Sequence, residues 1–121
     1  MTVKLSGIGY EHAKRLIEEG NFVDDEREAW SDHHPSTLTE NEYIEKNGLF
    51  EYGKWFLAIN DEYKVDSKRH YEFPYGDLKN VHRCGILAAK NRAGQSKYFD
   101  VENAAANLVA VIGKQARKNA R

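Results

Sequence analysis

The chain has 121 residues, of which 40% are hydrophobic and 12% aromatic, with a mean hydropathy of -0.76 and a formal net charge of -1. This length predicts a single domain, 1–121, with one core. The composition excludes a membrane protein, since no apolar run approaches the roughly 20 residues of a spanning helix. A polar start and a lone cysteine predict a reducing, cytoplasmic location.

Charge is spread unevenly along the chain. Residues 1–62 contain 14 Asp/Glu against 6 Lys/Arg, whereas residues 63–121 contain 5 against 12. An acidic helical part, 1–48, is therefore expected to precede an aromatic and basic part, 49–121. Two interpretations stay open at this point: the two parts lie side by side and neutralise each other, or the basic side chains form a face for an anionic partner.

The first part of the chain carries helix signals. Apolar side chains share one helical face between Ser6 and Gly20, which predicts a first helix. The spacing of Asp25 and Glu28 predicts a capping box for a short helix or turn, and Thr39 with Glu42 predicts a second, longer helix that ends at 47–48. Between them, the polar, proline-containing residues 31–37 predict a loop.

Bulky residues then become dense. Residues 54–60 fit a buried strand, and residues 69–73 fit its antiparallel partner. A helix over 49–60 remains the alternative, because a short apolar run does not separate the two states.

The stretch from His70 to Gln95 combines a turn with a helix. Pro74 and Gly76 predict the turn, and Asp77 is the expected N-cap of a helix over 78–93. A last helix over 100–113 has a continuous apolar stripe and should pack antiparallel to it. The prediction is an α+β fold: a mainly helical small single domain with a short antiparallel two-stranded sheet and a C-terminal antiparallel helix pair. Its expected core comprises Leu16, Ile17, Trp55, Leu57, Ile59, Phe73, Val81, Ala88, Leu108 and Ile112.

Several residues are of types that can bind a metal ion. The donors are Asp32, His33, His34, His70, His82 and Cys84. Their spacing matches no known zinc motif, so solvated histidines are the expectation. The sequence predicts no metal and no other cofactor, with His33 and His34 as the metal candidates to inspect.

Cys84 is the only thiol and hence the only cysteine nucleophile. His82 should diverge from it by about 200° on a helix and cannot act as its base. His70 is the first candidate for that role. A small buried core residue is the favoured interpretation of Cys84, so an enzyme is not the preferred prediction.

Aromatic and basic groups concentrate on the predicted turn and helix. The preferred hypothesis is a non-catalytic interaction module whose partner is another protein or a second copy of the chain. Nucleic-acid binding by the basic half is the alternative, against which the pI of about 6.5 counts. The predicted binding residues are Tyr71, Tyr75, Lys79, His82, Arg83 and Lys90.

The string FPYGD, five further residues, RCGILAAKNRAGQ and then DVENAAANL resembles a family of small bacterial proteins of unknown function. The resemblance covers about residues 55–112. The turn and the small-residue helix are also similar to a segment beside phage head-maturation protease domains. No catalytic Ser or His of such a protease matches a position here, so this resemblance implies shared packing and no activity.

Overall fold

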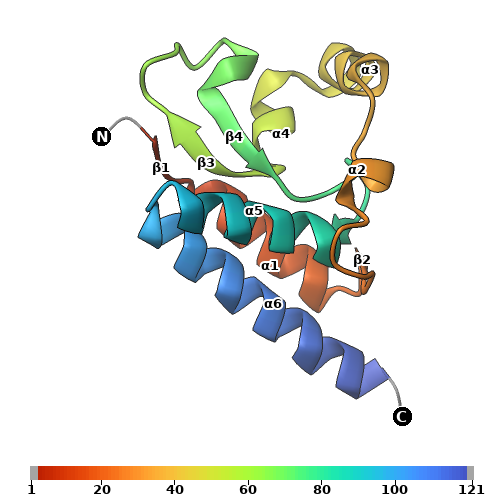
Figure 1. Ribbon diagram of the computed structural model, residues 1–121. Helices are drawn as coiled ribbons and strands as arrows, with labels where there is room; N and C mark the ends of the chain where they lie inside the picture. The colour runs from red at the N-terminus through yellow and green to blue at the C-terminus, as the bar shows by residue number, and fades with distance from the viewer. Residues whose placement is uncertain (1–2, 120–121) are drawn as a thin grey trace.

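The computed structural model describes residues 3–119, and Figure 1 shows how its elements are arranged. Helices account for most of the chain, with short strands between them. In chain order the elements are β1 (Val3–Leu5), α1 (Gly7–Glu18), β2 (Phe22–Val23), α2 (Trp30–His33), α3 (Thr37–Asn47), α4 (Leu49–Gly53), β3 (Phe56–Asn60), the 3-10 helix η1 (Lys68–His70), β4 (Tyr71–Pro74), β5 (Val81–His82), α5 (Arg83–Gln95) and α6 (Phe99–Asn119).

The main sheet has the strand order β1-β3-β4 and is antiparallel throughout. The predicted pairing of residues 54–60 with 69–73 is confirmed, with Phe56 opposite Pro74 and Ile59 opposite Tyr71. The third strand, β1, was not predicted, because three residues are too few to show a period. Helices α1, α5 and α6 lie together on one side of this sheet, while α3 and α4 lie on the side away from α6 (Figure 1).

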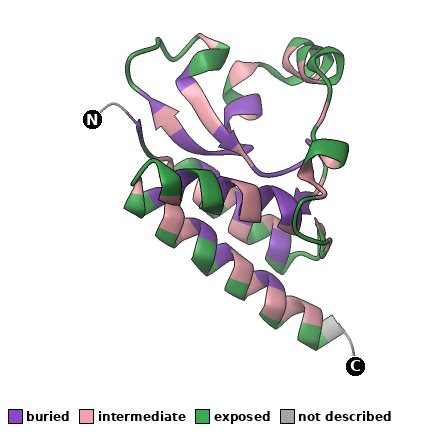
Figure 2. Cartoon of the chain, in the orientation of Figure 1, coloured by how far each residue is buried: buried purple, intermediate pink, exposed green. Residues whose placement is uncertain are grey.

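Helices α5 and α6 run antiparallel along each other, as the sequence predicts (Figure 1). Their buried residues face the sheet and α1, and the outward faces are exposed (Figure 2). Most of the predicted core is confirmed as buried, but Leu16, Ile59 and Ala88 are only half-buried. The buried members of the predicted core are Ile17, Trp55, Leu57, Phe73, Val81, Leu108 and Ile112.

Helix α5 begins at Arg83, so the predicted start at residue 78 and the N-cap Asp77 are wrong. Asp77 instead closes a tight turn, in which its Oδ1 accepts hydrogen bonds from the backbone N–H groups of Lys79 and Asn80. Leu78 has a φ of 72°, which a right-handed helix does not allow. Residues 81–82 then form β5 before the helix starts.

Two further cap predictions are wrong. No helix starts at Asp25, and Glu28 has a φ of 75° that interrupts any helix there, so of the predicted short helix or turn the turn is observed, at residues 27–28. Helix α3 begins two residues before Thr39, with Ser36 as its N-cap, because the Ser36 hydroxyl already accepts from the N–H of Thr39. The predicted loop 31–37 holds the end of α2 and the first residue of α3.

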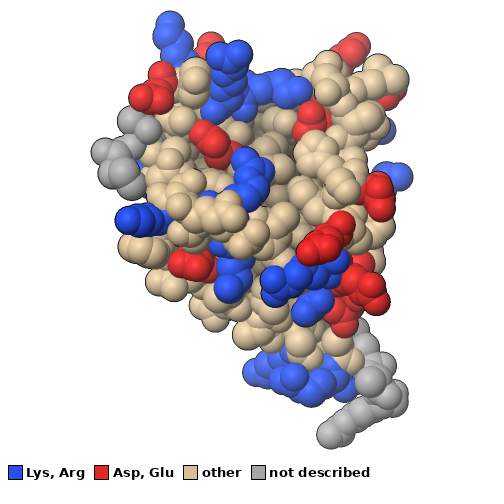
Figure 3. Space-filling model, viewed as in Figure 1, with Lys and Arg blue, Asp and Glu red and all other residues tan. Residues whose placement is uncertain are grey.

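Both alternatives for residues 49–60 are realised in succession. Leu49–Gly53 is helical as α4, and Phe56–Asn60 is strand β3. The acidic and basic halves also meet: Lys68 pairs with Glu40 at 3.5 Å, and Arg83 with Asp24 at 3.7 Å. Figure 3 shows both signs of charge interspersed over one face, with basic groups at the C-terminal turns of α6. Within residues 3–119, no helix combines the length and apolar character needed to cross a bilayer.

Gly9 marks the closest approach of α1 to the sheet, and its replacement by alanine is expected to destabilise the fold by about 3 kcal/mol. A Cβ atom there would overlap the backbone carbonyl of Phe56, which cannot move without disturbing β3. Gly7→Ala is the matched control, since a Cβ atom on Gly7 meets nothing within 4 Å. Urea denaturation of both variants measures the difference; equal stabilities would contradict the close packing of α1 on β3.

Candidate metal centre

A two-residue parallel pairing positions the candidate site. Strand β2 pairs with β5 so that Phe22 lies opposite Val81 and Val23 opposite His82. Asp25 lies two residues after Val23, and Cys84 lies two residues after His82. Because the strands are parallel, both residues follow the same end of the pairing, which brings them together. Parallel strands far apart in sequence give no local signal, so this juxtaposition is set by the tertiary fold.

The side chain of Asp25 caps the start of α5. The first N–H groups of a helix lack partners inside the helix, and His82, at the N-cap position, makes no side-chain capping bond. The backbone N–H of Cys84 donates instead to Oδ1 of Asp25 at 2.8 Å. A carboxylate here is also favoured by the helix dipole.

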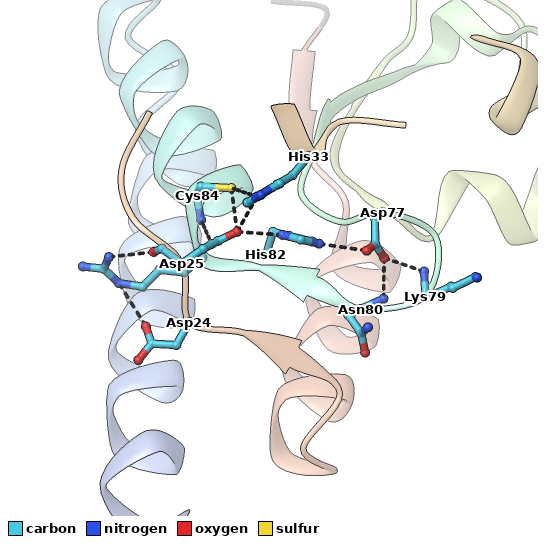
Figure 4. A network of polar contacts seen from close by, with 9 residues as sticks. Asp24, Asp25, His33, Asp77, Lys79, Asn80, His82 and Cys84 are labelled. Atoms are coloured by element: carbon cyan, nitrogen blue, oxygen red, sulfur yellow. Dashed lines mark hydrogen bonds and ion pairs between the residues drawn. The ribbon is translucent and has the colours of Figure 1, made fainter. Parts of the chain in front are cut away.

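The other carboxylate oxygen of Asp25 lies at the centre of three side chains (Figure 4). Its Oδ2 lies 2.7 Å from Nδ1 of His33, 2.7 Å from Nδ1 of His82 and 3.1 Å from Sγ of Cys84. Sγ of Cys84 also lies 3.5 Å from Nδ1 of His33. These four side chains, Asp25, His33, His82 and Cys84, are called the donor cluster below.

The donor cluster draws on separate segments. Asp25 follows β2, His33 is the last residue of α2, His82 ends β5, and Cys84 is the second residue of α5. His82 and Cys84 are buried, while Asp25 and His33 are partly exposed. The cluster thus joins the 24–34 segment to the start of α5.

Outer contacts fix the orientation of the cluster. The second ring nitrogen of His82, Nε2, lies 2.8 Å from Oδ2 of Asp77, and Asp77 is itself held by the turn that follows it. Arg83 donates to the backbone carbonyl of Asp25 at 3.2 Å. The His82 ring and the Asp25 backbone are therefore each held by a second partner.

The electrostatics follow from these contacts. Burial would raise the pKa of Asp25, but hydrogen bonds from His82, Cys84 and His33 outweigh it and lower the pKa to about 2. Burial would lower the pKa of His82, yet hydrogen bonds to Asp77 and Asp25 raise it. Burial and the neighbouring Asp25 carboxylate raise the pKa of the Cys84 thiol to about 12.

The donor cluster has the composition of a transition-metal site. One donor atom from each of its residues lies within 4.8 Å of all the others, and two imidazoles, a thiolate and a carboxylate are the ligands that tetrahedral Zn²⁺ takes. In many such sites a ligating histidine donates its other N–H to a carboxylate. Asp77 stands in that position behind His82.

Cysteine catalysis fits this geometry less well. Sγ of Cys84 lies closer to Asp25, at 3.1 Å, than to His33, at 3.5 Å, and burial with the carboxylate favours the protonated thiol, whereas a nucleophile needs the thiolate. His70, the predicted base, hydrogen-bonds instead through Nδ1 to the carbonyl of Tyr63, in the β3–β4 connection. The structure does not bring His70 to Cys84.

In the metal-free protein at neutral pH, we expect Cys84 to react with iodoacetamide on the order of a hundredfold more slowly than in denaturant. The raised pKa leaves very little thiolate, and Cys84 is 1% exposed. The rate of mass increase on the intact protein measures this. Faster labelling of the native protein would instead indicate an activated thiol.

The other residues singled out in the sequence are placed as follows. Tyr75 is fully buried and His82 is 5% exposed, so neither is available to a partner as the predicted surface requires. Tyr71 is half-buried, and its hydroxyl donates to the carbonyl of Val65. Lys79 is exposed, and Arg83 and Lys90 are partly so. Of the two metal candidates, His33 joins the cluster, while His34 is exposed and packs edge-on against Trp30.

Sequence reasoning missed Asp25 and Asp77 as parts of a site. Both were interpreted as helix caps, which is the commonest role of an aspartate before an apolar run. The one local signal in the sequence is that Asp25 stands eight residues before His33, the residue it contacts in the structure.

Comparisons with protein-family models, with curated proteins and with solved structures give no match.

Proposed function

We propose that this chain is a small, non-catalytic, zinc-binding module in which the metal ion fastens the 24–34 segment to helix α5. The observation that carries the proposal is the convergence of four ligand atoms, all within 4.8 Å of one another, from Asp25, His33, His82 and Cys84.

The donor types favour zinc over the hard cations. Magnesium and calcium prefer six or more oxygen ligands, whereas this cluster offers nitrogen and sulfur with one carboxylate. Zinc accepts that mixture in a tetrahedral arrangement. Asp25, His33, His82 and Cys84 would hold the ion, and because zinc ligands bind in their deprotonated forms, binding would release the proton of the Cys84 thiol.

The segment that the metal would hold has few other anchors. Helix α2 is four residues long, and none of its residues is fully buried. Trp30 packs partly against the surrounding rings, with its centroid 6.1 Å from that of His82. Because apolar burial there is small, a metal bond supplies what the core does not. Four protein ligands complete a tetrahedron, which favours a structural site over a catalytic one.

We also propose that such a module acts through contact with a protein partner. Lys79 and Lys90 belong to the predicted surface and reach solvent at least in part, and within residues 3–119 their side chains make no hydrogen bond or ion pair. Nucleic acid is the weaker alternative, since the ion pairs of Lys68 and Arg83 already neutralise part of the basic half.

Zinc titration of the metal-stripped protein, followed by native mass spectrometry and calorimetry, tests the metal proposal. We expect one zinc per chain. His33→Ala should weaken binding at least tenfold, and His34→Ala, at the exposed neighbouring position, should leave it unchanged. Cobalt in place of zinc should give a thiolate charge-transfer absorption that Cys84→Ser abolishes. No binding, or equal binding by the two histidine variants, would refute the site.

A further inference from the structure

Cys84 contributes the only sulfur of the donor cluster and borders a small cavity. This cavity, about 180 Å³, lies between residues 27–30 and α5, and Arg27, Trp30, Leu87 and Asn91 also line it. A water molecule takes about 30 Å³ of liquid, so the cavity has room for a molecule the size of hydrogen peroxide. Cys84 is only 1% exposed, but it lines this cavity, which gives small polar reagents a place to approach the residue.

We propose that the zinc site is a redox switch, in which oxidation of Cys84 by a peroxide releases the metal and frees the 24–34 segment from α5. This inference rests on the proposed zinc-binding function. Among the four ligands only the thiolate is readily oxidised, because imidazole and carboxylate ligands lack a comparable two-electron step.

The peroxide is the two-electron oxidant in the chemical step. The Cys84 sulfur attacks one peroxide oxygen, the S–O bond forms as the O–O bond breaks, and the departing hydroxide takes up a proton to become water. Sulfur loses two electrons and the peroxide gains them. The resulting sulfenic acid is a poor zinc ligand, so only three protein ligands remain, the affinity for zinc falls, and a competing chelator can remove the ion.

Reversal needs a thiol from outside the chain. Cys84 is the only cysteine in the sequence, so no internal resolving cysteine exists. A small thiol condenses with the sulfenic acid to a mixed disulfide and water, and a second small thiol then regenerates Cys84 and leaves as the symmetric disulfide.

The structural readout follows from how the segment is attached. When the ion leaves with Cys84 oxidised, no metal joins the four side chains, and a bulkier sulfur group stands in the contacts with Asp25 and His33. Helix α2 has no fully buried residue to hold it in place. The 24–34 segment should therefore lose amide protection while α6 keeps it.

The test uses the full-length, zinc-loaded protein treated with hydrogen peroxide. A chromogenic chelator follows zinc release, dimedone labelling with peptide mass mapping follows Cys84, and Met1, the only other sulfur, is mapped in parallel. We expect one zinc to be lost for each Cys84 oxidised, and glutathione followed by fresh zinc should restore binding. Hydrogen exchange should rise in 24–34 and at the start of α5, but not in α6.

Cys84→His is the matched variant, because it offers a fourth ligand that peroxide does not attack; its zinc should be retained. If that variant fails to fold, the mole-for-mole relation in the wild-type protein decides the matter. If zinc is retained when Cys84 is oxidised, or lost while Cys84 is intact, the redox switch is refuted but the zinc site is not. Protein that holds no zinc before peroxide is added would overturn the proposed function instead.

Discussion

Asp25→Ala is expected to destabilise the metal-free protein by about 3 kcal/mol, because it removes the common acceptor of a buried polar cluster. His33 and Cys84 would lose their closest acceptor, and the backbone N–H of Cys84 would lose its partner at the start of α5. The effect on His82 is smaller, since Asp77 still accepts from its Nε2.

Asp24→Ala is the matched control for this experiment. Asp24 is the preceding residue, its side chain is 51% exposed, and its ion pair with Arg83 is 3.7 Å long. Its loss should cost less than about 1 kcal/mol. Urea denaturation of both variants after metal removal measures the difference, and similar losses at both positions would show that the donor cluster contributes nothing to the metal-free fold.

The same contacts predict a window of pH stability for the metal-free protein. The folded-state pKa of Asp25 is lowered from 3.8 to about 2, so its stabilisation is complete above about pH 4 and is lost as the pH falls toward 2. The folded-state pKa of His82 is raised above 6.5, so its contribution is complete below that pH and is lost as the pH rises through the folded value. Asp25→Ala should remove much of the loss of stability that occurs as the pH falls from about 4 toward 2.

The fold was more predictable from sequence than the site. The last helix and the β3–β4 pair carry strong local patterns, in apolar periodicity and in bulky residues. The strand pair and the start of the helix were predicted close to their observed bounds, while α6 continues to Asn119, beyond the predicted end at residue 113. Local patterns misplaced the start of α5, because Asp77 has the chemistry of an N-cap and that of a turn residue alike. Only the pairing of β5 with β2 distinguishes these two roles of Asp77.

The donor cluster depends on contacts that no short window contains. His33 and Cys84 are 51 residues apart, and Asp25 and His82 are 57 apart. His33, His82 and Cys84 were each recognised as donors in the sequence, but adjacent histidines on a loop and a thiol near a helix start are common without a metal. Asp25 completes the set, and its place follows from a two-residue parallel pairing that has no sequence signature.

Zinc is expected to raise the stability of the metal-stripped protein by about 4 kcal/mol when free zinc exceeds the dissociation constant a thousandfold. For a domain of this size that corresponds to a rise in Tm of roughly 15 °C. The gain arises because the ligands converge only in the folded chain, so the ion binds the folded state and leaves the unfolded state almost unaffected.

The part of the chain that zinc stabilises distinguishes binding at the donor cluster from general ion binding. Hydrogen exchange should slow most in residues 24–34 and at the start of α5, since the ion would join these two parts. His33→Ala should lose most of the rise in Tm, while His34→Ala should keep it. Magnesium at the same concentration should have no effect, because the cluster offers too few oxygen ligands. A uniform slowing across α6, or an equal rise in the His33→Ala variant, would place the ion elsewhere on the chain.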